Sequence, residues 1–391
     1  MRTGVQGKLK LLAFSVASFM VFTVSARAKL PDSGCVAFSP RGSLARVVIH
    51  PPRLVLRIFS SGSASQAPVV GQLVLSRKEW PCRLSFSADG GLIAVTTYTG
   101  AGVQLRVWDR KACKWTATLH PSLPSAYAHD VEAVGFWKTS HNVAFTGSAA
   151  GIDGRVAVSV QSLSGSLVKQ VQGLPPGFLD PESGYYWVRS SGAPCQLQAR
   201  TLSGKAKVHL AVVLPPVQGS CLGYQPMFPS GGVLAGANAT GSGTVEVWVV
   251  HAGTGTPEIA SIAKPKKALL SRWADVSVRT TTSPSGNLLA VDRQVTDWSM
   301  EDTIQRQRND LWIYRLAPLA LVYHIPARAC GRLYAFAIGG VSGHPQLVED
   351  WCGEWHTDPV PMNDKTKQFR GNCIKHAGNS AGIAPGHARQ P

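Results

Sequence analysis

The chain has little of what most enzyme families use to build a catalytic centre. None of its eight cysteines forms a C-x-x-C pair, and no two of its eleven histidines lie three or four residues apart. It also has no Gly-x-Ser-x-Gly elbow, no phosphate-binding loop and no Gly-x-Gly-x-x-Gly motif. These absences leave the sequence without a redox, zinc, hydrolase or nucleotide-binding signature, and we expect no cofactor.

Long apolar runs are scarce as well, and the one such segment is Leu11 to Val24. It follows basic residues at positions 2, 8 and 10 and precedes the small-x-small site Ala26-Arg27-Ala28. It is too short to span a bilayer, although an uncleaved anchor is the alternative. We therefore predict a signal peptide over residues 1–28, a mature chain from Lys29 without a transmembrane segment, and a periplasmic or extracellular location.

Acidic residues are few relative to basic ones. The chain has 39 Lys and Arg against 22 Asp and Glu, a formal charge of +17, and removing the four basic residues of the predicted signal leaves +13. The basic residues are scattered, and export argues against a nucleic-acid partner. We expect a protein partner or an anionic cell-envelope partner, and the charge favours the second; a soluble basic surface with no partner is the alternative.

The eight cysteines all follow the predicted cleavage site, and an even number in an exported chain predicts disulfides. Sequence alone does not choose among the many possible pairings. Cysteines that are close in sequence can be brought together by the strands of one blade. This favours the disulfides Cys82–Cys113, Cys195–Cys221 and Cys352–Cys373, and the disulfide Cys35–Cys330 follows by elimination.

One short phrase recurs along the chain and predicts the fold. It reads Cys35-Val-Ala-Phe-Ser-Pro-Arg-Gly42, then Cys82-Arg-Leu-Ser-Phe-Ser-Ala-Asp-Gly90, then Thr281-Thr-Ser-Pro-Ser-Gly286, and each copy precedes a short apolar stretch. In the clearest copy we expect strands over residues 82–87, 92–97, 104–108 and 114–119. A repeat of about fifty residues built from short strands is typical of a β-propeller.

Seven starts of this repeat can be placed, so we predict an all-β propeller of seven four-stranded blades over residues 29–352. Six or eight blades stay possible because the fourth and seventh copies are degenerate. The ring would close where the segment around Cys35 joins the last blade beside Cys330. Residues 353–391 have few aliphatic side chains and no alternation, so we expect an extended, partly disordered tail.

The phrase and the third-strand pattern Val103-Gln-Leu-Arg-Val-Trp-Asp109 resemble the WD-repeat family. The looser relatives that the sequence resembles are exported bacterial propellers of the quinoprotein amine dehydrogenase-like kind. The resemblance implies a propeller fold and a tendency to bind partners, but it carries over no catalytic residue. The sequence departs from the WD-repeat pattern because it has only one Trp-Asp pair and no Gly-His dipeptide before an inner strand. His129-Asp130 is the nearest substitute for that dipeptide.

Candidate reactive residues each have a simpler structural interpretation. His129 and Asp130 form a possible proton-transfer dyad, but a hydrogen bond that fixes a turn is the favoured reading. His356, Asp358 and His376 fit a solvated tail better than a surface metal site. The charged stretch Thr296–Arg308 is predicted to be an insertion between strands of the sixth blade. The acids of this stretch, with Asp292 just before it, could form a calcium site, but their irregular spacing favours a solvated charged loop. These acids are Asp292, Asp297, Glu301 and Asp302.

The tryptophans at equivalent third-strand positions, Trp108, Trp248 and Trp312, are predicted to be core residues facing between blades. We therefore expect a non-catalytic interaction scaffold. The alternatives are a propeller hydrolase, lactonase or oxidoreductase with a metal or cofactor in the channel, and a carbohydrate-binding module. An enzyme of that kind should carry acidic, Asn or His residues on several inner strands. A binding surface would use exposed aromatic residues, and the candidates are Tyr185, Tyr186, Trp298 and Trp355.

Overall fold

The computed structural model divides the chain into two compact units, Met1–Leu30 and Pro31–Pro391, and all the residues it describes belong to the second. The predicted signal peptide therefore lies outside the described residues. These are residues 36–50, 53–59, 69–74, 80–138, 141–150, 154–181, 183–189, 195–203, 206–214, 233–240, 242–251, 257–265, 273–299, 304–327, 332–341, 344–351 and 354–360.

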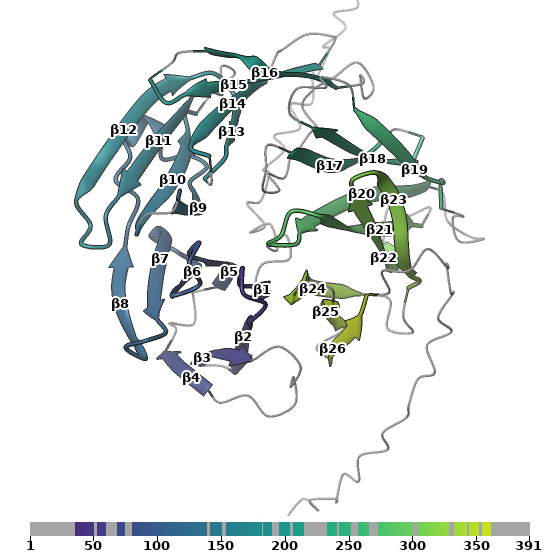
Figure 1. Ribbon diagram of the computed structural model, residues 1–391, viewed down its shortest axis with the longest axis horizontal. Helices are drawn as coiled ribbons and strands as arrows, with labels where there is room; N and C mark the ends of the chain where they lie inside the picture. The colour runs from purple at the N-terminus through teal and green to yellow at the C-terminus, as the bar shows by residue number, and fades with distance from the viewer. Residues whose placement is uncertain are drawn as a thin grey trace, which may run out of the picture. The chain divides into compact units, whose positions relative to one another are not determined.

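The described residues form seven antiparallel sheets, numbered here in chain order (Figure 1). Sheet 1 contains β1 (Val36–Phe38), β2 (Leu44–His50), β3 (Arg53–Phe59) and β4 (Val69–Val74). Sheet 2 contains β5 (Trp80–Phe86), β6 (Leu92–Thr99), β7 (Gly102–Asp109) and β8 (Lys114–Leu119). After the short 3-10 helix η1 (Ser125–Tyr127), sheet 3 contains β9 (Glu132–Trp137), β10 (Asn142–Ser148), β11 (Val156–Gln161) and β12 (Leu167–Leu174).

The remaining sheets continue the same up-and-down order. Sheet 4 contains β13 (Gly177–Leu179), β14 (Tyr185–Arg189), β15 (Cys195–Thr201) and β16 (Ala206–Leu214). Sheet 5 contains β17 (Val233–Ala239), β18 (Val245–His251) and β19 (Glu258–Ile262). Sheet 6 contains β20 (Trp273–Thr282), β21 (Leu288–Trp298), β22 (Ile304–Leu316) and β23 (Leu319–Ile325). Sheet 7 contains β24 (Leu333–Val341), β25 (His344–Trp351) and β26 (Glu354–Pro359).

Each sheet packs a face against the next, which produces a propeller. Separate apolar clusters join sheets 1 and 2, 2 and 3, 3 and 4, 4 and 5, 5 and 6, and 6 and 7. A seventh cluster joins sheet 7 back to sheet 1, where Val36 and Phe38 pack against Ala335, Ala337 and Val348. The predicted all-β propeller is confirmed. Five sheets have four described strands and two have three, so the predicted count of seven four-stranded blades stays a prediction.

The recurring phrase folds into one kind of tight turn between the first two strands of a sheet. In sheet 2, the Ser87 N–H donates to the Leu92 carbonyl (3.0 Å) and the Gly90 N–H donates to the Ser87 carbonyl (2.8 Å). The buried Ser87 hydroxyl accepts the Leu92 N–H (2.9 Å). Ser283 and Gly286 repeat this arrangement in sheet 6, and both glycines have a φ of 69°, which favours glycine. The phrase thus encodes local hydrogen bonding.

The charged stretch Thr296–Arg308 is mostly the end of a long hairpin. Strands β21 and β22 have 11 and 13 residues and stay paired as far as Trp298. Within this hairpin Asp297 is fully buried and forms an ion pair with Arg308. The interpretation of this stretch as a solvated loop is therefore wrong for Asp297, which is neutralised between strands. Residues 300–303, with Glu301 and Asp302, lie outside the described residues.

The last sheet extends beyond the predicted tail boundary at residue 352. Strand β26 pairs with β25 from Trp351↔Glu354 to Gln346↔Pro359. The next residue, Val360, is 4% exposed and belongs to the cluster between sheets 6 and 7. The predicted start of the tail at residue 353 is thus too early, because a third strand is needed to cover sheet 7.

Closure of the ring predicts a sensitive glycine. A Cβ atom at Gly339 on β24 would overlap the Phe38 side chain at the joint between sheets 7 and 1. We expect Gly339→Ala to destabilise the protein by about 1–3 kcal/mol through overpacking. Urea unfolding followed by tryptophan fluorescence measures this. The control is Gly100→Ala, whose Cβ meets nothing within 4 Å; equal stability of the two variants would contradict the packing argument.

Candidate functional site

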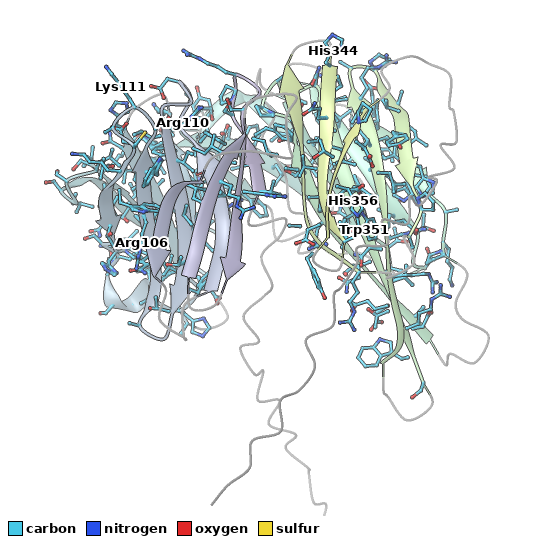
Figure 2. All side chains as sticks on the ribbon, turned by 90° about the horizontal axis from the view of Figure 1, so that it is seen from below. Arg106, Arg110, Lys111, His344, Trp351 and His356 are labelled. Carbon is cyan, nitrogen blue, oxygen red and sulfur yellow. The ribbon has the colours of Figure 1, made fainter. Side chains whose placement is uncertain are left out.

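One end of the sheets carries the tight turns, and we call it the turn face. Because neighbouring strands are antiparallel, the turns after the first and third strands of a sheet reach the same end. Residues 39–43, 87–91, 110–113 and 283–287 all occupy such turns. Figure 2 shows Arg110 and Lys111 at this end together with His344, which begins the second strand of sheet 7.

Four basic residues lie on or directly beside the turns of sheets 1 and 2, which are in contact through Arg110. One of them, Arg110, bridges the two sheets, since its guanidinium donates to the Gly90 carbonyl (2.8 Å) and to the Ser43 hydroxyl (3.5 Å). It also lies 5.9 Å from the ring centroid of Phe86. The other three side chains are exposed. We call this group the basic cluster, and it consists of Arg41, Arg110, Lys111 and Lys114.

The acids beside the basic cluster are engaged within the turns. Asp89 accepts the Ser87 hydroxyl (2.6 Å) and the Gly91 N–H (3.0 Å), and these hydrogen bonds lower the pKa of Asp89. Asp109 accepts two backbone N–H groups of the turn that follows it (2.8 and 2.9 Å). Within the described residues, no side chain of the basic cluster forms an ion pair. The turn face therefore carries positive charge that its neighbours leave unpaired.

A cavity of about 350 Å³ is lined by residues from sheets 2, 3, 4 and 6. Its charged lining residues are Arg83 on β5, Glu132 on β9 and Asp130 just before β9, and all three side chains are exposed. Val134 and Phe178 supply apolar surface. At its edge the Ser148 hydroxyl donates to Asp130 (3.3 Å). A concave site with apolar walls and a few charged groups is typical of small-molecule binding.

A buried ion pair clamps sheet 6 to sheet 7. The Arg279 guanidinium contacts the fully buried carboxylate of Asp292 at 2.6 Å and donates to the Leu333 and Tyr334 carbonyls (2.5 and 3.1 Å). The Asn309 amide donates to both carboxylate oxygens of Asp292 (2.9 and 3.1 Å). Burial raises the pKa of Asp292, and the Arg279 charge acts in the opposite direction. Both carboxylate oxygens of Asp292 are therefore engaged by Arg279 and Asn309.

The opposite face of sheet 6 carries a second polar group. Arg293 forms an ion pair with Asp310 (2.5 Å) and donates to the Ala263 carbonyl beyond sheet 5 (2.7 Å). It also lies over the Trp312 ring, on which His324 stacks with 3.7 Å between ring centroids. Burial lowers the pKa of His324. These contacts serve packing between sheets.

The structure does not gather the predicted aromatic residues into one exposed surface. Tyr186 is fully buried and its hydroxyl donates to the Pro175 carbonyl (2.7 Å), so its assignment to a binding surface is wrong. Tyr185 packs partly against the cluster between sheets 4 and 5. Trp298 is half-buried and its indole N–H donates to Asp275 (2.7 Å). The Trp355 side chain lies outside the described residues.

Of the predicted core tryptophans, Trp108 and Trp312 lie on the third strands of sheets 2 and 6, and Trp248 lies on β18, the second described strand of sheet 5. Trp108 and Trp248 are 4% and 1% exposed, and Trp312 is half-buried. Trp108 packs in the cluster between sheets 1 and 2, Trp248 between sheets 4 and 5, and Trp312 against the cluster between sheets 5 and 6. Their prediction as core residues is confirmed for Trp108 and Trp248, whereas Trp312 is half-buried at the edge of a cluster.

Cys113 is a free, exposed thiol in the turn after β7. Cys82 follows Pro81 on β5. Pro81 pairs with Thr97 on β6, and Thr97 pairs with Gln104 near the start of β7. The two cysteines thus lie at opposite ends of sheet 2, too far apart for Cα atoms that must come within about 7 Å. This geometry contradicts Cys82–Cys113. The other three predicted bridges lie outside the described side chains; they join Cys195–Cys221, Cys352–Cys373 and Cys35–Cys330.

The remaining predicted reactive groups do not converge. His129 contacts Asp130 at 3.3 Å, and both side chains are largely exposed. Among the residues that the structure describes, no group of three or more His, Cys, Asp or Glu side chains could hold a metal ion. Glu301, Asp302 and His376 are outside those residues. Of the helices in the described part of the chain, none is long and apolar enough to cross a membrane.

Sequence reasoning missed the two sites that the structure assembles. Arg83 and Glu132 belong to the inner-strand segments Cys82-Arg-Leu-Ser and Val131-Glu-Ala-Val, whose pattern indicates a strand and no site. Charged residues on inner strands of otherwise apolar repeats are the signal that could have found the cavity. The basic cluster could not be predicted from the sequence, because no sequence pattern shows that the turns of sheets 1 and 2 touch.

No family model and no curated protein sequence matches the chain. The structure is similar to the solved "Complex of KlAtg21 with coiled-coil of AgAtg16", with a TM-score of 0.51 and 13% identity over 84% of this chain and 94% of that one. It is less similar to "Crystal Structure of Mitotic Checkpoint Complex", with a TM-score of 0.49 and 12% identity over 85% and 90% of the two chains. For "Crystal structure of TolB from Acinetobacter baumannii" the TM-score is 0.40 and the identity 14% over 59% and 54%. The first similarity supports the fold alone.

The depressed pKa of His324 predicts a pH dependence of stability. The unfolded chain protonates this imidazole below about pH 6.5 while the folded protein resists it, so stability is lost as the pH falls through that value. We expect His324→Phe, which keeps a ring on Trp312, to lose less stability between pH 7 and pH 5 than the wild type. Urea midpoints at the two pH values measure this, and parallel pH profiles would contradict it.

The exposed thiol of Cys113 predicts a labelling result. We expect iodoacetamide to alkylate Cys113 in the native protein without reductant, because the side chain is exposed and free. Peptide mapping of the labelled protein checks this. Recovery of Cys113 in a disulfide-linked peptide would contradict this prediction and show that the cysteine forms a disulfide.

Proposed function

We propose that the protein is an exported, non-catalytic scaffold that binds an acidic partner protein through the basic cluster on its turn face. The observation that carries this proposal is the arrangement of Arg41, Arg110, Lys111 and Lys114 around two touching turns, with the adjacent acids already engaged. Unpaired charge on a rigid surface attracts an oppositely charged partner and orients it during encounter.

The support for a scaffold comes from rigidity at this surface. The turns that carry the cluster are held by backbone and serine hydrogen bonds, and Arg110 links the two sheets. A partner therefore meets charges whose backbone positions are fixed before binding, which reduces the entropy cost of association. A protein of similar fold has been solved in complex with a coiled coil, as its title states, and this agrees with a docking role for such a fold.

Export is a part of this proposal that rests on the sequence. The basic and apolar segment before Lys29 supports it, and the even number of cysteines is compatible with an oxidising compartment. An extracellular or periplasmic location would place the basic turn face among acidic secreted or envelope proteins.

Charge neutralisation on the turn face should weaken binding of an acidic probe. The test variant is Arg41→Gln/Lys111→Gln/Lys114→Gln, and the control Lys169→Gln/Lys264→Gln/Arg306→Gln removes the same charge from exposed positions elsewhere. With a fluorescent poly-L-glutamate peptide of about twenty residues as probe, we expect the test variant to lose about tenfold in affinity and the control much less. Fluorescence anisotropy at low and physiological salt measures both.

Two results would overturn the proposal. Equal losses in the test and control variants would mean that net charge, rather than the turn face, attracts the probe. Absence of binding by the wild type even at low salt, where exposed charges interact most strongly, would remove the acidic partner altogether.

A further inference from the structure

The cavity brings together a cation and an anion that do not pair with each other. Arg83 and Glu132 come from the neighbouring inner strands β5 and β9 and line the same space. Arg83 donates a long hydrogen bond of 3.5 Å to the Ala133 carbonyl. Within the described residues, neither Arg83 nor Glu132 forms an ion pair, and Glu132 has no hydrogen-bond partner. Most of the hydrogen-bonding capacity of both groups is therefore open to a ligand.

The remaining lining limits the ligand to a small amphiphilic molecule. Val134 and Phe178 provide apolar walls, and the Thr146 and Thr282 side chains provide hydroxyl groups. The volume of about 350 Å³ is at the lower end of small-molecule pockets, which start near 300 Å³. Asp130 adds a second carboxylate at the edge, so the acids outnumber the single arginine and a phosphate-rich ligand is disfavoured.

We propose that this cavity binds a zwitterionic α-amino acid or dipeptide with an apolar side chain. Arg83 would receive the ligand carboxylate through a charge-assisted, bidentate hydrogen bond, which the planar guanidinium suits. Glu132, with Asp130 nearby, receives the ammonium group, and the ligand side chain lies against Phe178 and Val134. The proposal does not depend on the acidic partner of the turn face.

Calorimetric titration of the purified full chain tests the proposal with charge-matched probes. The probes are L-leucine and L-leucyl-L-leucine, with N-acetyl-L-leucine lacking the ammonium group and L-leucinamide lacking the carboxylate. We expect at least one zwitterion to bind and each single-charge analogue to bind about tenfold more weakly, or worse. No binding of either zwitterion at 10 mM (about the weakest measurable range), or equal binding of the analogues, would overturn it.

Variants locate the site and assign each charge. We expect Arg83→Gln and Glu132→Gln each to weaken zwitterion binding by about tenfold or more, and Lys111→Gln on the turn face to leave it unchanged. Arg83→Gln should also erase the preference for leucine over leucinamide, because that preference depends on the ligand carboxylate. Both substituted side chains are exposed, and circular dichroism confirms folding. Unchanged affinity in both folded variants would mean that the zwitterion binds elsewhere, and would overturn the assignment.

Discussion

Face-to-face packing between successive sheets is the constraint on which the rest of this structure depends. A central sheet of three or four short strands has two apolar faces, and a chain of such sheets would leave one face uncovered at each end. The cluster of Phe38 and Val36 against Ala335 and Ala337 covers both of these end faces at once. The cavity depends on this ring, because its lining residues come from sheets 2, 3, 4 and 6, which are not all neighbours in the chain.

Much of the fold could be predicted because its signals are local. The Ser-x-x-Gly turn uses the serine hydroxyl, the glycine φ and the next strand within a few residues, so it leaves a readable phrase. For sheet 2, the expected strands over residues 82–87 and 92–97 agree with β5 and β6 within two residues. The burial of Asp292 and Asp297 could not be read in this way. Their partners, Arg279 and Arg308, lie on adjacent strands, and only the register shows that each carboxylate meets a guanidinium.

The candidate sites were less predictable because each joins residues that are far apart in the sequence. Ser43 and Arg110 belong to different repeats, and only their contact shows that the turns carrying the basic cluster touch. The register shift between Pro81 and Arg83 changes which side chains of β5 face the cavity, and no sequence pattern marks such a bulge. The same register explains the failure of Cys82–Cys113: sharing a blade does not bring two residues to the same end of it.

The few acidic residues are unevenly distributed, so the net positive charge is not spread evenly over the protein. Sheet 6 pairs three of its arginines with acids of the same sheet, as Arg279–Asp292, Arg293–Asp310 and Arg308–Asp297. The acids in the turns of sheet 2 are hydrogen-bonded to backbone groups and stand beside basic side chains that they do not pair with. With 39 basic and 22 acidic residues in the chain, the excess cannot be neutralised everywhere. The turns of sheets 1 and 2 carry part of that excess on one face, and this is the surface that the proposed acidic partner would recognise.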